Sequence, residues 1–129
     1  MRINGISSNE QSFGYSTVLS RLYKKGKLPT VKYGLYGNKL TAKTCSNEHL
    51  IPVSLGGRTV LNNIALCDKT ANSVRGNKDI QEFLTVDMIK EHLSQYMDVI
   101  VKKGKEVIFD GNEYIKNIIP TFQKLGFKF

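Results

Sequence analysis

The chain has few cysteines, no CxxC pair and no long hydrophobic run, although 40% of its 129 residues are hydrophobic. Cys45 and Cys67 alone cannot form a disulfide framework, so a disulfide-stabilised secreted domain is excluded. No apolar segment approaches the length of about 18 residues that a membrane span needs. We therefore expect a globular protein that has no membrane partner.

The opening of the chain also lacks the apolar core that is typical of a secretory signal, and the predicted location is the cytoplasm. The sequence shows no internal repeat and no low-complexity segment. A length of 129 residues is ordinary for one domain. We predict a single domain over residues 1–129, with a core motif at about 44–78 and C-terminal helices at about 79–126.

Acidic residues are scarce relative to basic ones. The chain has 19 Lys and Arg but only 11 Asp and Glu, which gives a formal net charge of +8. A small domain with this excess of positive charge favours a polyanionic partner, and nucleic acid is the commonest one. Because many basic proteins bind no DNA, the charge indicates a partner only together with a motif.

In the first part of the chain, local signals predict one helix and little regular structure around it. Residues 1–13 are rich in Ser, Asn and Gly and are predicted to be irregular. A short helix is predicted from about Thr17 to Lys25, where Gly26 ends it. Residues 29–43 are predicted as loop or weak strand.

Two short strands, at about 44–51 and 63–67, are predicted on either side of a connection that contains Pro and Gly. If the strands pair around this connection, they form an antiparallel hairpin. Cys45 and Cys67 then lie on neighbouring strands as buried thiols. A short helix from about 68 to 75 follows and should pack across the hairpin. The predicted fold class is therefore α+β.

Helices are predicted for the C-terminal part. Thr85 is expected to cap a helix that continues to about Lys103, with His92 on its surface. Asp110 is expected to cap a final helix, which Pro120 should kink or break. The buried stripe of the first of these helices is predicted to comprise Ile89, Leu93, Tyr96, Met97 and Ile100.

The residues that carry chemistry lie in the segment 48–78. Thirteen residues separate His49 from Asn63, and eight separate Asn63 from Asn72. The ordered set comprises Glu48-His49, Pro52, Gly56-Gly57, Asn63, Asn72 and Arg75-Gly76.

This segment resembles the HNH endonucleases, whose motif has an acid followed by His, a Gly-containing connection, Asn, and a helix bearing His or Asn. The resemblance implies a ββα-metal core and a metal-dependent endonuclease that hydrolyses DNA to a 5′-phosphate and a 3′-hydroxyl. One ion per site, Mg²⁺ or Mn²⁺, is expected, because the segment lacks the cluster of three or more carboxylates that would hold a pair. Two features depart from the family. Asp68 and Ala71 stand where many members have zinc-binding CxxC pairs, so no structural zinc is expected, and Glu48 stands where Asp is commoner.

Hydrolysis of a phosphodiester needs a base for the attacking water and a means of stabilising negative charge. His49 is the candidate general base, because imidazole accepts a proton near neutral pH. Glu48 and the amide oxygen of Asn72 are candidate metal ligands, because Mg²⁺ prefers hard oxygen ligands. Neighbouring strand residues point to opposite faces, so the strand must bend for Glu48 and His49 to share a site.

The remaining candidate residues are expected to position the base or to bind the DNA backbone. Asn63 is expected to fix the ring of His49 or the loop that carries it, although the adjacent Asn62 is an alternative for this position. Arg75 and Lys78 follow the helix residue of the motif and are expected to bind DNA phosphates.

Two other functions are compatible with the sequence. The chain could be a catalytically inactive nucleic-acid-binding module that kept the same scaffold, or a basic interaction domain in which the motif is accidental. The retention of both His49 and its acidic neighbour favours the enzyme. The sequence leaves open the oligomeric state and the DNA structure recognised. A single site cuts one strand, so a monomer is expected to nick.

Overall fold

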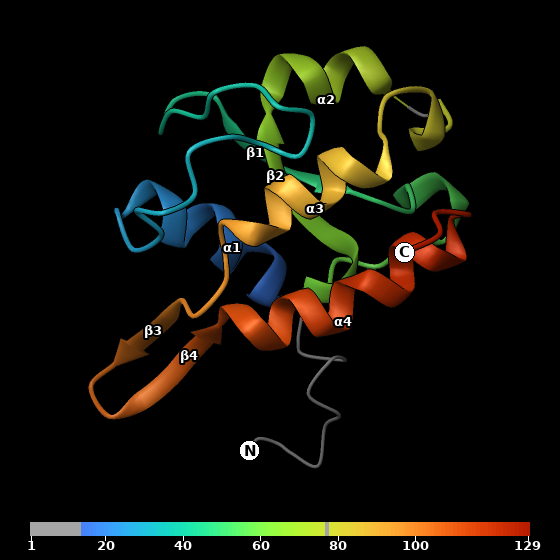
Figure 1. The fold of residues 1–129 in the computed structure, drawn as a ribbon. Coiled ribbons are helices and arrows are strands. Elements are labelled where there is room, and N and C mark those ends of the chain that lie inside the picture. The colour runs from blue at the N-terminus through green and yellow to red at the C-terminus, as the bar shows by residue number, and fades with distance from the viewer. Residues whose placement is uncertain (1–13, 77) are drawn as a thin grey trace.

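The computed structural model describes residues 14–76 and 78–129, and the segment 1–13, predicted to be irregular, lies outside them. Within the described residues the chain is α+β, with helices and two separate two-stranded antiparallel sheets, as expected at this level (Figure 1). The elements are α1 (Gly14–Lys24), β1 (Cys45–His49), η2 (Val53–Leu55), η3 (Leu61–Asn63), β2 (Ile64–Asp68), α2 (Lys69–Arg75), η4 (Ile80–Glu82), α3 (Val86–Ser94), β3 (Ile100–Lys103), β4 (Glu106–Asp110) and α4 (Gly111–Lys124).

The predicted first hairpin is confirmed. β1 and β2 pair antiparallel in a register that sets Cys45 opposite Asp68 and His49 opposite Ile64. Cys45 and Cys67 are buried free thiols on the two neighbouring strands. Burial raises the pKa of the Cys45 thiol to about 11, so this side chain stays protonated and packs as a small apolar group.

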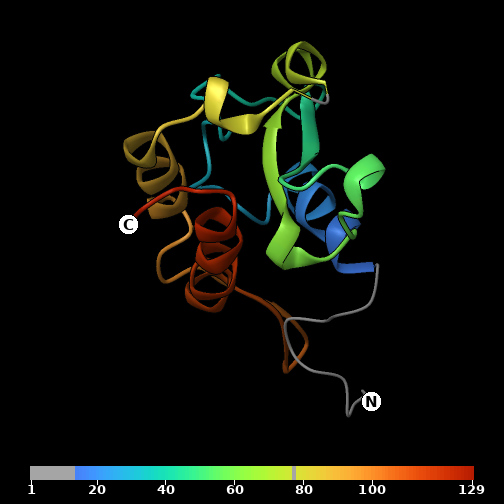
Figure 2. The same ribbon diagram turned by 90° about the vertical axis from the view of Figure 1, so that its right-hand side faces the viewer.

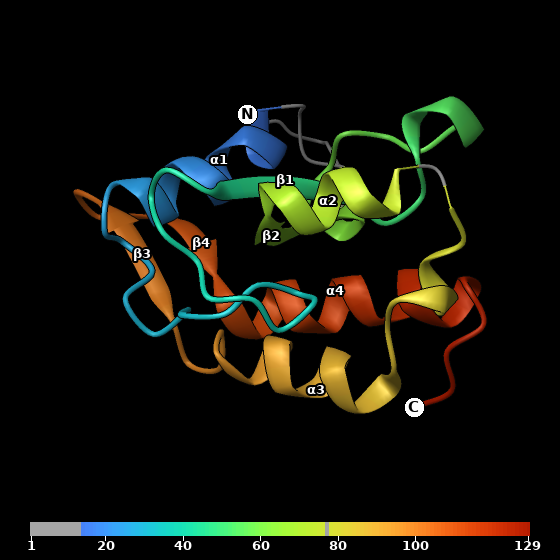
Figure 3. The same cartoon turned by 90° about the horizontal axis from the view of Figure 1, so that it is seen from above.

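α2 begins where the sequence predicts, because Asp68 caps it. The Asp68 carboxylate accepts hydrogen bonds from the backbone N–H groups of Thr70 and Ala71. The helix ends at Arg75, before Gly76, whose φ of 54° is unfavourable for residues with a side chain. α2 lies across the hairpin and contacts both of its strands (Figure 3).

The first hairpin occupies the middle of the molecule. α1 lies on one side of it and α3 and α4 lie on the other, while the second hairpin, β3–β4, projects away from the body (Figures 1 and 2). The large side chains with the least exposure come from almost every part of the described chain, so the core is continuous. They include Leu19, Leu28, Leu35, Leu50, Ile64, Leu66, Ile80, Ile89, Tyr96, Ile118 and Phe122.

The segment between α1 and β1, predicted as loop or weak strand, forms turns with one isolated bridge between Tyr33 and Lys39. Part of it follows the outer edge of β2, where the backbone N–H of Leu35 donates to the carbonyl of Leu66 at 2.8 Å. A Cβ on Gly34 would lie 2.8 Å from the Cα of Cys67. Glycine is therefore needed at this position for the segment to reach the sheet.

The structure ends α3 at Ser94, so the predicted continuation of this helix is wrong. Asp98 has a φ of 61°, which is incompatible with a right-handed helix. The branched residues 99–101 then lead into β3, because branched side chains pack well on a strand. Met97 and Ile100, predicted to be buried, are 60% and 48% exposed.

α4 begins at its predicted cap, where the carboxylate of Asp110 accepts two backbone N–H bonds. Pro120 does not break this helix, because α4 continues to Lys124, so of the predicted kink or break only the kink stays a prediction. Pro120 lies on the exposed side, while Ile118 and Phe122 are fully buried on the other side and hold the helix in place. No helix in the described part of the chain has the length and apolar content needed to cross a membrane.

Candidate functional site

α2 brings Asn72 onto β1, beside the acidic residue of the motif. The Asn72 side-chain nitrogen Nδ2 donates to Oγ of Ser46 and to the carbonyl oxygen of Asn47, both at 3.3 Å. Because a carbonyl can only accept, the NH₂ group of the Asn72 amide must face β1. The amide oxygen Oδ1 is therefore directed away from these two contacts and is available as an acceptor.

Glu48 is buried, with 3% exposure, and two side chains contact the same carboxylate oxygen. The hydroxyl of Tyr36 donates to Oε2 at 2.6 Å, and the Arg75 guanidinium lies 3.4 Å from that atom. Burial raises the pKa of the Glu48 carboxyl, while the Tyr36 hydrogen bond and the Arg75 charge oppose this effect. Neither contact uses Oε1, the second oxygen of the carboxylate.

The prediction that Arg75 binds DNA phosphate is wrong for this structure, because Arg75 is buried with only 3% exposure. Its guanidinium donates to the carbonyl oxygens of His49, Leu50 and Lys78 at 2.9–3.3 Å. Arg75 therefore joins the end of α2 to the end of β1 and neutralises Glu48. Lys78 is exposed, and its predicted contact with phosphate stays a prediction.

His49 is the last residue of β1, where the strand passes into the connection, and its side chain is partly exposed. Its Nε2 lies 3.1 Å from Oγ1 of Thr59, a residue of the same connection. Thr59 thus holds the His49 ring, while Asn72 and Arg75 contact the strand that leads to it.

Asn63 fastens the connection between the two strands. Its Oδ1 accepts from the backbone N–H of Ile51 at 2.8 Å, and its Nδ2 donates to the carbonyls of Ile51 and Arg58 at 3.1 and 2.9 Å. Asn63 is 5% exposed, so these bonds are sheltered from water. Asn62 instead accepts a bond from Thr121 through its backbone carbonyl. Of the two candidates, Asn63 is the one whose side chain braces the loop after His49.

The two glycines of the connection have a steric role in this bracing. A Cβ on Gly57 would lie 1.7 Å from the carbonyl oxygen of Ile51, which no side chain can occupy. Gly56 has a φ of 90°, in the left-handed region that favours glycine. The pair therefore allows the chain to fold back closely on Ile51, two residues after His49.

Sequence reasoning missed two residues of the site. Thr59 lies within the motif segment, ten residues after His49, and only this position in the chain could have indicated its role. Tyr36 belongs to the segment before β1 and had no local signal, because its contact with Glu48 depends on how that segment crosses the sheet.

The donor set fits a hard divalent cation that has few protein ligands. Oε1 of Glu48 and Oδ1 of Asn72 are oxygens left out of the contacts above, and Mg²⁺ and Mn²⁺ prefer such ligands. Among the described residues, no group of three or more His, Cys, Asp or Glu could hold a metal ion. An ion at this position would complete its shell with water and phosphate oxygen.

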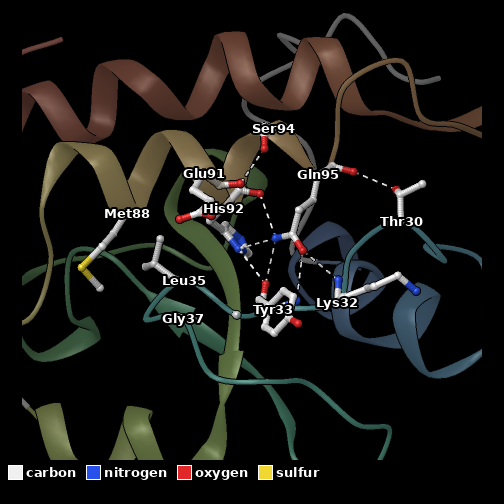
Figure 4. Close-up of a pocket in the computed structure, with 11 residues that line it drawn as sticks. Thr30, Lys32, Tyr33, Leu35, Gly37, Met88, Glu91, His92, Ser94 and Gln95 are labelled. Atoms are coloured by element: carbon white, nitrogen blue, oxygen red, sulfur yellow. Dashed lines mark hydrogen bonds between the residues drawn. The ribbon is translucent and has the colours of Figure 1, made fainter.

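A separate cavity of about 580 Å³ lies between α3 and the segment before β1 (Figure 4). It contains no motif residue. His92 lines it, and the prediction that His92 lies on the surface is wrong, because it is 3% exposed. Its Nδ1 lies 3.0 Å from the carbonyl oxygen of Tyr33, and burial lowers its pKa to about 4.

Comparisons with known proteins gave no matching family model, no matching curated protein and no matching solved structure.

Proposed function

We propose that the chain is a metal-dependent HNH-type endonuclease that hydrolyses DNA phosphodiester bonds. The observation that carries the proposal is the placement of Asn72 on β1 immediately before Glu48 and His49. In the proposed site, Oε1 of Glu48 and Oδ1 of Asn72 act as oxygen ligands, and the partly exposed His49 follows Glu48 directly in the chain. The resemblance to HNH endonucleases implies these roles for the residues of a ββα-metal core.

In the proposed reaction, His49 accepts a proton from a water molecule as that water attacks the phosphorus atom. The bond between phosphorus and the 3′ oxygen breaks, and this oxygen takes up a proton from solvent water, so that the products are a 5′-phosphate and a 3′-hydroxyl. A divalent ion held by Glu48 and Asn72 would stabilise negative charge on the phosphate group. Thr59 orients the imidazole, and Asn63 fixes the loop on which Thr59 lies.

DNA would approach the face formed by α2 and the connection between the strands. Lys69, the first residue of α2, and Lys78, just beyond its end, are both exposed. The formal net charge of +8 favours a polyanion on such a surface. Because one site attacks one strand, the expected product is a nick.

The direct test is incubation of the protein with supercoiled plasmid, with Mg²⁺, with Mn²⁺ and with EDTA, followed by gel electrophoresis. We expect relaxed circles only when a divalent ion is present. His49→Ala should slow nicking by about 10²–10⁴-fold, the usual contribution of a general base. Lys116→Ala changes an exposed residue of α4 and serves as the control that should nick normally. Nicking by His49→Ala at the wild-type rate would contradict the proposed mechanism.

One observation favours the second candidate, a nucleic-acid-binding module without catalysis. Arg75 already neutralises Glu48 in the interior, so the carboxylate has a partner without any metal ion. A module of this kind would bind duplex DNA and leave plasmid intact with every divalent ion. Substitutions of His49 and Glu48 would then leave DNA binding unchanged.

A further inference from the structure

Tyr36 reaches the candidate site from a part of the chain that has no motif residue. Its hydroxyl lies 2.6 Å from Oε2 of Glu48, which is the distance of a strong hydrogen bond to a carboxylate. The Arg75 guanidinium is farther from the same oxygen, at 3.4 Å. Tyr36 therefore makes the tighter of these two contacts with the Glu48 carboxylate.

The position of the Tyr36 ring is fixed independently of Glu48. The preceding residue, Leu35, is bonded through its backbone to Leu66 on the edge of β2. The ring also packs edge-on against Phe83, with centroids 6.5 Å apart. Because the backbone before Tyr36 is bonded to the sheet and its ring packs against Phe83, the hydroxyl can be held at one place without following the carboxylate.

A glutamate side chain has several rotatable bonds, and a carboxylate that turns freely is a poor ligand because its ordering opposes binding. The hydrogen bond from Tyr36 uses Oε2 and leaves Oε1 outside the contact. Resting on the proposed function, we infer that Tyr36 is a positioning residue, which orients the Glu48 carboxylate so that Oε1 can ligate a divalent cation.

The inference predicts a loss of metal affinity when the hydroxyl alone is removed. Tyr36→Phe keeps the ring and its contact with Phe83. Outer partners of metal ligands commonly contribute about 10–100-fold to metal affinity, and we expect a weakening in this range. Tyr114→Phe is the matched control, because the Tyr114 hydroxyl also makes a 2.6 Å bond, in its case to the backbone carbonyl of Ile64. Tyr114→Phe should alter stability and leave metal affinity unchanged.

The experiment measures binding of Mn²⁺ by electron paramagnetic resonance, in the presence of a short DNA duplex. All proteins carry His49→Ala, so that the duplex stays uncut and binding is read without turnover. The four proteins are the parent and its derivatives with Tyr36→Phe, Tyr114→Phe or Glu48→Gln. The expected result is weaker binding with Tyr36→Phe and Glu48→Gln only.

The outcomes separate the inference from the proposed function. Equal Mn²⁺ affinity in the parent and the Tyr36→Phe derivative overturns the inference, while metal-dependent nicking by the wild type leaves the proposed function standing. Equal losses in the Tyr36→Phe and Tyr114→Phe derivatives also overturn it, because the effect is then one of stability. A parent that binds no Mn²⁺, together with a wild type that nicks no plasmid, overturns both.

Discussion

The first hairpin with α2 and the C-terminal part of the chain are held together in different ways. Among the described residues, the buried polar or charged side chains are Glu48, Asn63 and Arg75 in the hairpin region and His92 in the C-terminal part. The hairpin region thus encloses an ion pair and two sets of directed hydrogen bonds. In the C-terminal part, apolar and aromatic packing around Tyr96, Tyr114 and Phe122 is joined by less buried hydrogen bonds of Gln95 and Asn112.

This difference indicates in which region the exact positions of side chains matter more than the stability of the fold. Burying an ion pair such as Glu48–Arg75 costs much of its Coulomb energy in desolvation, and apolar packing would serve stability as well. Hydrogen bonds, however, hold a donor and an acceptor within a narrow range of distances and angles. The region with the costly polar interior is also the region that contains the motif.

The largest effect is expected from removing the buried cation of the hairpin region. Arg75→Ala removes the buried charge that neutralises Glu48, together with three hydrogen bonds to backbone carbonyls, and it should destabilise the fold by about 3–5 kcal/mol. Urea unfolding measures this change. Lys78→Ala, which removes an exposed cation nearby, is the control and should change stability by less than about 0.5 kcal/mol. Similar small effects in both variants would mean that Arg75 does not hold the end of α2 and the end of β1 together.

The next effect concerns the one buried polar side chain described in the C-terminal part. The pKa of His92 is lowered to about 4 in the folded state, below its unfolded value of 6.5. Stability is therefore fully present above pH 6.5 and is lost as the pH falls towards 4, because the unfolded chain binds a proton that the folded one excludes. The expected loss is on the order of 3 kcal/mol.

Urea unfolding of the wild type and of His92→Gln between pH 7 and pH 4 tests this expectation. The variant cannot take up the proton, so its stability should fall less steeply over this interval. Parallel pH profiles for the two proteins would show that the buried imidazole is not responsible.

A smaller effect on stability is expected at the two neighbouring asparagines, and it should differ between them. Asn63→Ala leaves buried backbone groups of the connection unpaired and should cost about 1–3 kcal/mol, together with a loss of nicking. Asn62→Ala should preserve both stability and nicking, because its described bond uses the backbone.

In the C-terminal part, Ile118→Val should cost about 0.5–1.5 kcal/mol of stability and leave nicking intact. Loss of nicking in Ile118→Val would remove the distinction between the two regions.

The smallest effect is electrostatic. Lys78→Ala should weaken duplex binding for all sequences alike and reduce the slope of log affinity against log salt by about 0.9. Fluorescence anisotropy at several salt concentrations measures the slope, and Lys116→Ala on α4 is an exposed control of the same charge. An unchanged slope would place Lys78 outside the DNA contact.

Much of the hairpin region could be predicted because its signals are local. A Pro/Gly connection between two short strands defines the hairpin. Asp68 caps the helix that follows, through hydrogen bonds to backbone N–H groups at most three residues away. In the C-terminal part, Asp110 defined the start of a helix equally well. The end of α3 could not be predicted in this way. The stripe through Met97 and Ile100 fits a helix, and only the turn at Asp98 with the pairing of β3 and β4 decides against it.

By itself, the sequence determined the paired strands with their buried thiols, the capped starts of α2 and α4, and the order of the motif residues. Each depends on contacts between residues close in the chain or on a single hairpin register. The tertiary structure alone decided that Arg75 turns inward, that His92 is buried and that Tyr36 meets Glu48. These outcomes depend on which distant segment covers a side chain, and burial of a polar group becomes favourable only when that segment supplies its partner.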